Sequence, residues 1–177
     1  MATVALDLLG GDGAPGVVAD AIARLCGPES SQPGSPDPAD LIVVGPAAVA
    51  RELLVERGVD PDRVRIVDAG RGASMAGNPL SMLRAHDDVT VTVAVGLVNA
   101  GLADAWVSVG HTGAAVAAAV LGLGRLSGMS RPALAVVLPS LAGPVVLVDA
   151  GAAPDATPDV LRQFALAGWA YSRSLGV

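Results

Sequence analysis

Short aliphatic runs alternate along this chain with longer segments of helical character, and this alternation restricts the fold more than any other feature. The runs lie at residues 3–9, 41–44, 64–67, 105–109, 133–138 and 145–149. Strands that are apolar on both faces belong to sheets covered by helices on both sides. The sequence therefore predicts α/β layering around a mainly parallel sheet. Because no domain-scale linker interrupts the pattern, residues 1–177 are expected to form a single α/β domain.

The segments between the runs carry helix signals. Helices are expected over Pro15–Leu25, over Pro46–Gly58, from Thr112 onward and over Pro158–Leu175. Residues 27–39 and 69–79, which are rich in glycine and small residues, are expected to be loops.

Residues 88–101 carry two conflicting signals. Valines alternate with threonine and alanine from Val89 to Val95, which is the period of a strand. Against this, Asp87 and Asp88 are good helix caps, and Gly101 suits a helix end. A connection between two parallel strands is usually a helix, so a helix is expected here.

The composition excludes several classes of function. All eleven basic residues are arginine, and the absence of lysine excludes Schiff-base catalysis and a Walker A phosphate loop. A net charge of −6 without a basic cluster argues against nucleic-acid binding. Cys26, the single cysteine, allows no internal disulfide and fits a reducing cytosol as a small buried side chain. With no signal peptide or spanning helix predicted, the expected location is cytoplasmic.

Three glycine-rich turns follow predicted strands. They span residues 7–13, 108–113 and 149–155. Ligands of open α/β sheets bind outside the carboxyl ends of the strands, so these turns are expected to meet in one crevice. Free N–H groups at a helix start attract anions, which makes Gly110–Gly113 a candidate phosphate cradle with Thr112 as a hydroxyl donor. The alternative is a purely structural use of glycine in these turns.

Neither a dinucleotide site nor a metal site is predicted. No G-x-G-x-x-G follows a strand with an acidic residue about 20 positions later. His86 and His111 lack carboxylate or thiol neighbours at ligand spacing. The sequence therefore indicates no cofactor and no metal.

Several blocks of the sequence match the motifs of one known protein family. The opening A-L-D-L-L-G-G-D-G-A-P is similar to the start of that family, and S-V-G-H-T-G-A, beginning at Ser108, stands where the family has S-A-G-N-T-G-A. R-P-A-L-A, from Arg131, and V-D-A-G-A, from Val148, match further blocks. Smaller matches are found at Pro79, Leu83, Arg84, Asp88, Leu138, Pro139, Asp155, Pro158, Leu161, Gln163–Ala165 and Gly168. The blocks come in family order over nearly the whole chain, and together they resemble the PlsX family of acyl-carrier-protein:phosphate acyltransferases.

The resemblance implies a three-layer α/β/α sandwich like that of isocitrate dehydrogenase and phosphate acetyltransferase. It also implies transfer of a fatty acyl group from acyl-carrier protein to inorganic phosphate, giving acyl phosphate for phospholipid synthesis. The residues implied as catalytic are His111, Thr112 and Asp149. Those implied for phosphate or substrate binding are Asp7, Gly10, Gly11, Asp12, Arg84, His86, Gly110, Gly113, Gly151 and Asp155. Backbone N–H groups at the first two turns are expected to bind the phosphate and the developing oxyanion.

The sequence departs from the family pattern at several positions. Two lysines of the family are replaced by His86 and Asp87, and two serines by Val89 and Thr90. A neutral histidine and an aspartate do not replace two ammonium groups beside an anion. His111 and Ala153 stand where the family has asparagine.

Family members are also roughly twice as long. The chain is therefore expected to form a homo-oligomer or to join a partner chain that supplies the missing half, with any membrane contact peripheral, weak and made through that partner. The alternative function is a truncated, catalytically inactive homologue that acts as a binding or scaffold subunit, or half of a split enzyme. A nucleotide-binding domain and a decayed gene fragment are more distant alternatives.

Overall fold

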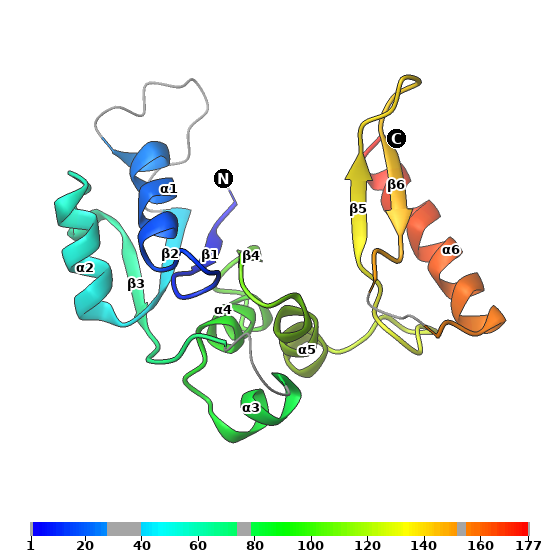
Figure 1. Cartoon of the computed structure of the whole chain (residues 1–177), viewed down its shortest axis with the longest axis horizontal. Helices are drawn as coiled ribbons and strands as arrows, with labels where there is room; N and C mark the ends of the chain where they lie inside the picture. Colours follow the sequence, from blue (N-terminus) through cyan, green and yellow to red (C-terminus); the bar gives the residue numbers. More distant parts are fainter. Residues whose placement is uncertain (1, 28–39, 74–78, 152–154, 177) are drawn as a thin grey trace. The chain divides into compact units, whose positions relative to one another are not determined.

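The computed structural model describes residues 2–27, 40–73, 79–151 and 155–176. The chain divides into two compact units, residues 1–123 and 124–177 (Figure 1). The expected loop at 27–39 lies almost wholly outside the described residues, as does the middle of the loop at 69–79. That the two units form a single domain, as the sequence predicts, stays a prediction.

The first unit is built on a four-stranded parallel sheet. Its strands are β1 (Val4–Asp7), β2 (Leu41–Gly45), β3 (Arg65–Asp68) and β4 (Ala105–Val107), in the spatial order β3-β2-β1-β4. In the register of the sheet, Val4 of β1 lies opposite Leu41 on one side and Ala105 on the other. Because every pair is parallel, the carboxyl ends of all four strands lie at one edge.

Helices connect these strands and flank the sheet. They are α1 (Gly16–Cys26), α2 (Ala47–Glu56), the 3-10 turn η2 (Pro61–Arg63), α3 (Pro79–Ala85), α4 (Thr90–Asn99) and α5 (Thr112–Leu123). The predicted mainly parallel α/β architecture is confirmed, and the layering is that of an α/β/α sandwich.

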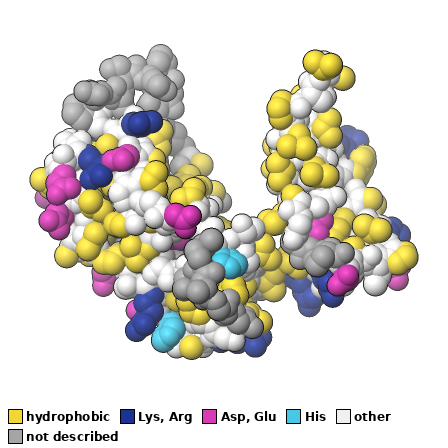
Figure 2. Space-filling model, in the orientation of Figure 1, with side chains coloured by type: hydrophobic (Ala, Val, Ile, Leu, Met, Phe, Trp, Pro, Cys, Tyr) yellow, Lys and Arg dark blue, Asp and Glu magenta, His cyan; other side chains and the backbone are white. Residues whose placement is uncertain are grey.

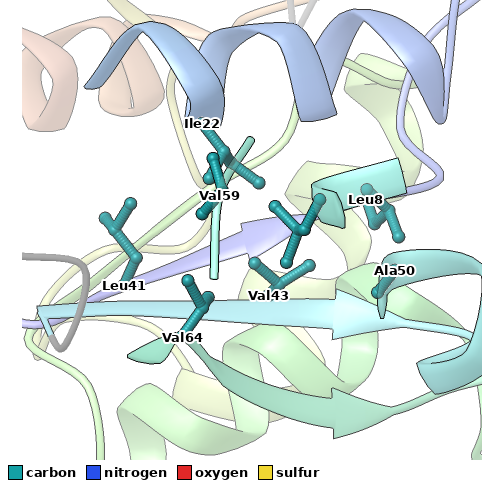
Figure 3. Close-up of a cluster of buried hydrophobic side chains, with 8 residues drawn as sticks. Leu8, Ile22, Leu41, Val43, Ala50, Val59 and Val64 are labelled. Carbon is teal, nitrogen blue, oxygen red and sulfur yellow. The ribbon is translucent and has the colours of Figure 1, made fainter. Parts of the chain in front are cut away.

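Alternate residues of β2 face the two layers of helices. Leu41 and Val43 pack in a cluster that includes Ile22 of α1 and residues of α2 (Figure 3). Ile42 and Val44 point the other way, into a cluster with residues of α4. All four side chains are at most 4% exposed. Two-sided burial explains why this strand reads as an unbroken aliphatic run.

The ambiguous segment 88–101 contains helix α4, as expected. Its buried residues Val91, Ala94 and Val95 follow helical spacing, so the alternation of valine and threonine is not that of a strand. The prediction that Asp87 and Asp88 cap this helix is wrong. Val89 occupies the N-cap position without a side-chain cap bond, and Asp88 pairs instead with Arg71.

Helix α3 is not expected from the sequence, which predicts a loop up to residue 79 and no element directly after it. The helix has a single buried residue, Leu83, which packs in a cluster with Val91 of α4 and Ala118 of α5. A helix of seven residues has too few apolar positions for its period to be recognised in the sequence.

The second unit consists of a hairpin and one helix. Strands β5 (Ala135–Leu138) and β6 (Val145–Val148) pair antiparallel as a separate two-stranded sheet, at the positions expected for strands. Helix α6 (Pro158–Ser174) begins after the N-cap Thr157 and buries Val160 and Phe164. The hairpin carries exposed aliphatic side chains, which are Val136, Val137, Leu138, Val145 and Leu147. Figure 2 shows hydrophobic side chains along the visible face of the hairpin. The expected burial of this segment in a core is not found within the described residues.

Candidate functional site

The first two glycine-rich turns meet at the carboxyl edge of the sheet through Asp7 and Ser108. Leu6 of β1 lies opposite Val107 of β4, so the next residues, Asp7 and Ser108, are also neighbours. The Ser108 hydroxyl donates to Asp7 Oδ2 at 2.7 Å, and the Leu9 N–H donates to Asp7 Oδ1 at 3.1 Å. Since Asp7 is only 2% exposed, this carboxylate fixes the turn rather than facing solvent.

Glycine is required where the two turns touch. A Cβ on Gly10 would lie 2.6 Å from Ser108 Oγ and 2.7 Å from Asp7 Oδ2. A Cβ on Gly110 would lie 3.1 Å from the Cα of Gly10. Gly11 has a φ of +106°, a conformation that other residues rarely adopt. The two turns are therefore in close backbone contact, and Ser108 Oγ also accepts the Gly110 N–H at 3.2 Å.

Helix α5 starts at this contact, directly after His111. The Ala114 N–H donates to the backbone oxygen of His111 at 2.9 Å and lies 3.3 Å from His111 Nδ1. The imidazole thus folds back over its own helix as a cap, with Nδ1 as acceptor and Nε2 as the remaining donor. The N–H groups of Thr112 and Gly113 are first-turn groups, for which a helix offers no internal acceptor. Both residues are exposed, so this helix start is accessible to an anion.

The segment after β3 also approaches the carboxyl edge. A Cβ on Gly72 would lie 3.1 Å from the Cβ of Leu9, in the turn after β1. The neighbouring Arg71 binds both carboxylate oxygens of Asp88 through Nε, at 3.0 and 3.2 Å. Sequence reasoning misses this third turn of the first unit, because its partner Asp88 lies 17 residues away.

Neither a metal-binding cluster nor a membrane-spanning helix is found among the residues that the structure describes. Within those ranges, no group of three histidine, cysteine or acidic side chains is arranged to hold a metal ion. Over the same ranges, no helix combines the length and the apolar composition needed to cross a membrane.

The family model for fatty acid synthesis proteins matches residues 2–176. This chain belongs to that family, the PlsX family.

Curated relatives of the family carry the name phosphate acyltransferase. The relative from Desulfitobacterium hafniense (strain Y51) is 39% identical over 175 residues, covering 99% of this chain and 50% of the relative. That of Heliobacterium modesticaldum is 38% identical over 173 residues, covering 97% and 49%. That of Thermosynechococcus vestitus is 40% identical over 175 residues, covering 97% and 48%. The chain thus spans about half the length of the curated relatives it matches.

The segment that contains Arg84 and His86 lies on and directly after α3. Pro79, the first residue of α3, is 3.7 Å from the position a Cβ on Gly113 would take, so the two helix starts are neighbours. Arg84 lies in the last turn of α3 and is exposed, whereas His86 follows the helix and is half-buried. No hydrogen bond or ion pair between described residues joins either side chain to the two interlocked turns. Their part in a PlsX-type site stays a prediction.

The remaining predicted residues are placed separately. Asp12 is exposed in the turn after β1. Asp149, Gly151 and Asp155 belong to the second unit, where Asp149 Oδ1 accepts the Leu134 N–H at 3.4 Å. Ala153, which stands where the PlsX family has asparagine, lies outside the described residues. The structure brings together Asp7, Gly10, Gly11, Gly110, His111, Thr112 and Gly113. That the glycine-rich turn at residues 149–155 joins them stays a prediction.

Proposed function

We propose that this chain carries the phosphate-binding part of a phosphate acyltransferase, which transfers a fatty acyl group from acyl-carrier protein to inorganic phosphate for phospholipid synthesis. The observation that carries the proposal is the interlocking of the turns after β1 and β4 at the start of helix α5, with the Ser108–Asp7 hydrogen bond of 2.7 Å between them. The family match and the names of the relatives support it.

The proposed reaction is a displacement at a thioester carbonyl. An oxygen of hydrogenphosphate forms a bond to the carbonyl carbon, the carbon–sulfur bond breaks, and the proton of hydrogenphosphate ends on the released thiol. The products are acyl phosphate and free carrier protein. Electrons and protons balance without a cofactor or metal. The enzyme must bind an anion and stabilise a developing oxyanion.

Residues of the first unit suit these two tasks. The first-turn N–H groups of α5 and the Thr112 hydroxyl are proposed to bind the phosphate, because they are accessible donors at the positive end of the helix dipole. The N–H groups near Gly10–Gly11 and the free Nε2 of His111 are proposed to face the carbonyl oxygen. Asp7 and Ser108 act as positioning residues, since they bind the turns and not the substrate. Asp149, Gly151 and Asp155 are proposed to complete the substrate side.

A partner that completes the site is part of the same proposal. Because the chain spans about half the length of its curated relatives, we propose that a second copy or a separate chain completes the site. A cytoplasmic location, with membrane contact only through such a partner, is part of the same proposal.

Replacing Thr112 with valine tests the phosphate site. The variant keeps the shape of the side chain and removes one donor to a charged ligand, so the KM for phosphate is expected to rise roughly tenfold. Carrier-protein thiol release and hydroxylamine-trapped acyl phosphate are measured with palmitoyl-carrier protein. The measurement uses the chain alone, and then with the carboxyl-terminal half of the Desulfitobacterium hafniense relative added.

The matched control is Ser174→Ala, which removes an exposed hydroxyl that bonds only its own helix, to the backbone oxygen of Tyr171 at 2.7 Å. This variant is expected to keep the parent KM. Thiol release that does not depend on phosphate would contradict the proposed phosphate site, and the absence of release in both preparations would instead support the inactive binding subunit.

Restoring the family residue at position 111 gives a second test. His111→Asn keeps a cap acceptor for Ala114, since asparagine is among the best N-cap residues, so the free energy of unfolding is expected to stay within about 0.5 kcal/mol. The amide donor in place of the imidazole is expected to raise the rate of phosphate-dependent acyl transfer roughly tenfold, because donors to the developing oxyanion act on kcat. A lower rate at unchanged stability would remove His111 from the proposed site.

A further inference from the structure

A half-open aliphatic cavity of about 460 Å³ lies between α1 and the β1–β4 side of the sheet. Its wall residues are aliphatic except for Asp7. Helix α1 contributes Val17 and Leu25. Val107 at the end of β4 and Val109 in the turn after it line the opposite wall. The volume falls in the usual range of small-molecule sites, about 300–1,000 Å³. We refer to this cavity as the α1 groove.

The α1 groove exposes large apolar side chains on both of its walls. On the helix wall, Val17 is 50% exposed and Leu25 is 40% exposed. On the sheet wall, Val107 is 48% exposed and Val109 is 62% exposed. Because β4 is the last strand in the sheet order, no further strand among the described residues of the first unit extends this face. Aliphatic side chains that line one concavity and remain in water favour an apolar occupant.

The α1 groove is continuous with the candidate phosphate site. Val109 lies between Ser108 and Gly110, and its Cγ2 is 3.1 Å from the position a Cβ on Gly11 would take. Asp7, which accepts the Ser108 hydroxyl, also belongs to the groove wall. Val17, in the first turn of α1, is 3.5 Å from the position of a Cβ on Gly13. The end of the groove at Val17 and Val109 is thus formed by the same turns as the site.

The wall chemistry selects a hydrocarbon with its polar group at one end. A ligand with polar groups along its length would lose hydrogen bonds to water without finding partners on these walls. No basic residue lines the groove, so a carboxylate or phosphate has no counter-ion inside it. The interlocked turns and the candidate anion site lie at the Val109 end of the groove. A polar head is therefore favoured there, with the tail running toward Leu25, about 12 Å along α1.

We propose that the α1 groove holds the acyl chain of the transferred group, and that Val107 and Val17 determine which acyl chains the site accepts. The proposal rests on the proposed function, because it takes the acyl carbonyl to lie at the Gly10–Gly110 contact. A chain that fills the groove covers the exposed valines of both walls. Longer chains emerge beyond Leu25 at the amino edge of the sheet.

Filling the groove tests the proposal without requiring turnover. Val107→Trp adds a large side chain to the sheet wall, and Val17→Trp does so from the helix wall, in case the first variant does not fold. The probe is cis-parinaric acid, whose fluorescence rises in apolar surroundings. Each variant is expected to weaken its binding at least tenfold relative to the parent chain. The control Val137→Trp, on the exposed β5 hairpin, is expected to change binding less than twofold, since Val137 is 43% exposed and belongs to the other unit.

Acyl transfer then separates this proposal from the proposed function. Val107→Trp is expected to raise the KM for palmitoyl-carrier protein at least tenfold, with little change for the butyryl form and for phosphate. Suppose that the parent chain binds parinaric acid, that Val107→Trp loses this binding, and that no protein transfers acyl groups. The α1 groove then binds an acyl chain as proposed, whereas the proposed acyltransferase function fails. If transfer occurs with unchanged chain-length preference in the folded variants, the groove proposal is overturned. It is equally overturned if the parent chain binds no parinaric acid, or if sedimentation shows that the parent chain dimerises while both groove variants are monomers.

Discussion

Replacement of Gly10 with alanine is expected to lower the free energy of unfolding of the first unit by roughly 2–4 kcal/mol and to abolish phosphate-dependent acyl transfer. The added Cβ would lie 2.6 Å from Ser108 Oγ and 2.7 Å from Asp7 Oδ2, both closer than van der Waals contact permits. Neither atom can retreat freely, because they bind each other at 2.7 Å and Asp7 is buried. The strain must therefore move the turn after β1 away from the turn after β4.

The matched control is Gly96→Ala in the interior of α4. A Cβ at this position meets nothing within 4 Å, and alanine is the better helix former, so the variant is expected to gain about 0.5–1 kcal/mol. Urea unfolding followed by far-ultraviolet circular dichroism measures both changes. Equal stability of Gly10→Ala and the parent chain would mean that the two turns are not in the close contact described.

The layers of the fold are predictable because burial on both faces leaves a sequence signal. Leu41 to Val44 form an uninterrupted aliphatic run since alternate residues enter two different clusters. The segment 88–101 needs a topological argument, because its valines follow the period of a strand although it contains α4. The cap of that helix is not predictable in this way. Asp88 accepts hydrogen bonds from Arg71 and does not cap the helix. This contact depends on where β3 ends.

The site is predictable as far as it depends on strand ends. Asp7 and the Gly110–Gly113 turn meet because β1 and β4 are neighbours in a parallel sheet. Ser108 could have been singled out by the same register, since it lies opposite Asp7. The side-chain direction of His111 could not, because it depends on the local cap in which Nδ1 accepts the Ala114 N–H at the start of α5. Arg84 and His86 are predicted as site residues from the family resemblance alone. In the structure they lie at the carboxyl end of α3, whereas Pro79 at its start is the residue beside Gly113.

Replacement of Asp7 with alanine is expected to lower the free energy of unfolding of the first unit by roughly 2–4 kcal/mol. The substitution leaves the Ser108 hydroxyl and the Leu9 N–H without their acceptor at a position that is 2% exposed. Asp7→Asn is expected to cost less, about 1 kcal/mol, since the amide oxygen still accepts from Leu9 and the amide nitrogen can donate to Ser108 Oγ. Asp12→Ala, an exposed carboxylate in the same turn, is expected to change stability by less than about 0.5 kcal/mol.

A double-mutant cycle between Asp7 and Ser108 separates their hydrogen bond from simple loss of packing. Ser108→Ala alone leaves a buried carboxylate oxygen without its donor, so it is expected to cost about 1–3 kcal/mol. If the 2.7 Å bond holds the two turns together, the double variant loses less than the sum of the single losses, by roughly 1–2 kcal/mol. Urea unfolding of the four proteins gives this coupling energy. Additive losses would mean that each residue supports its own turn independently, and the joint anion site proposed for this edge of the sheet would then lose its structural basis.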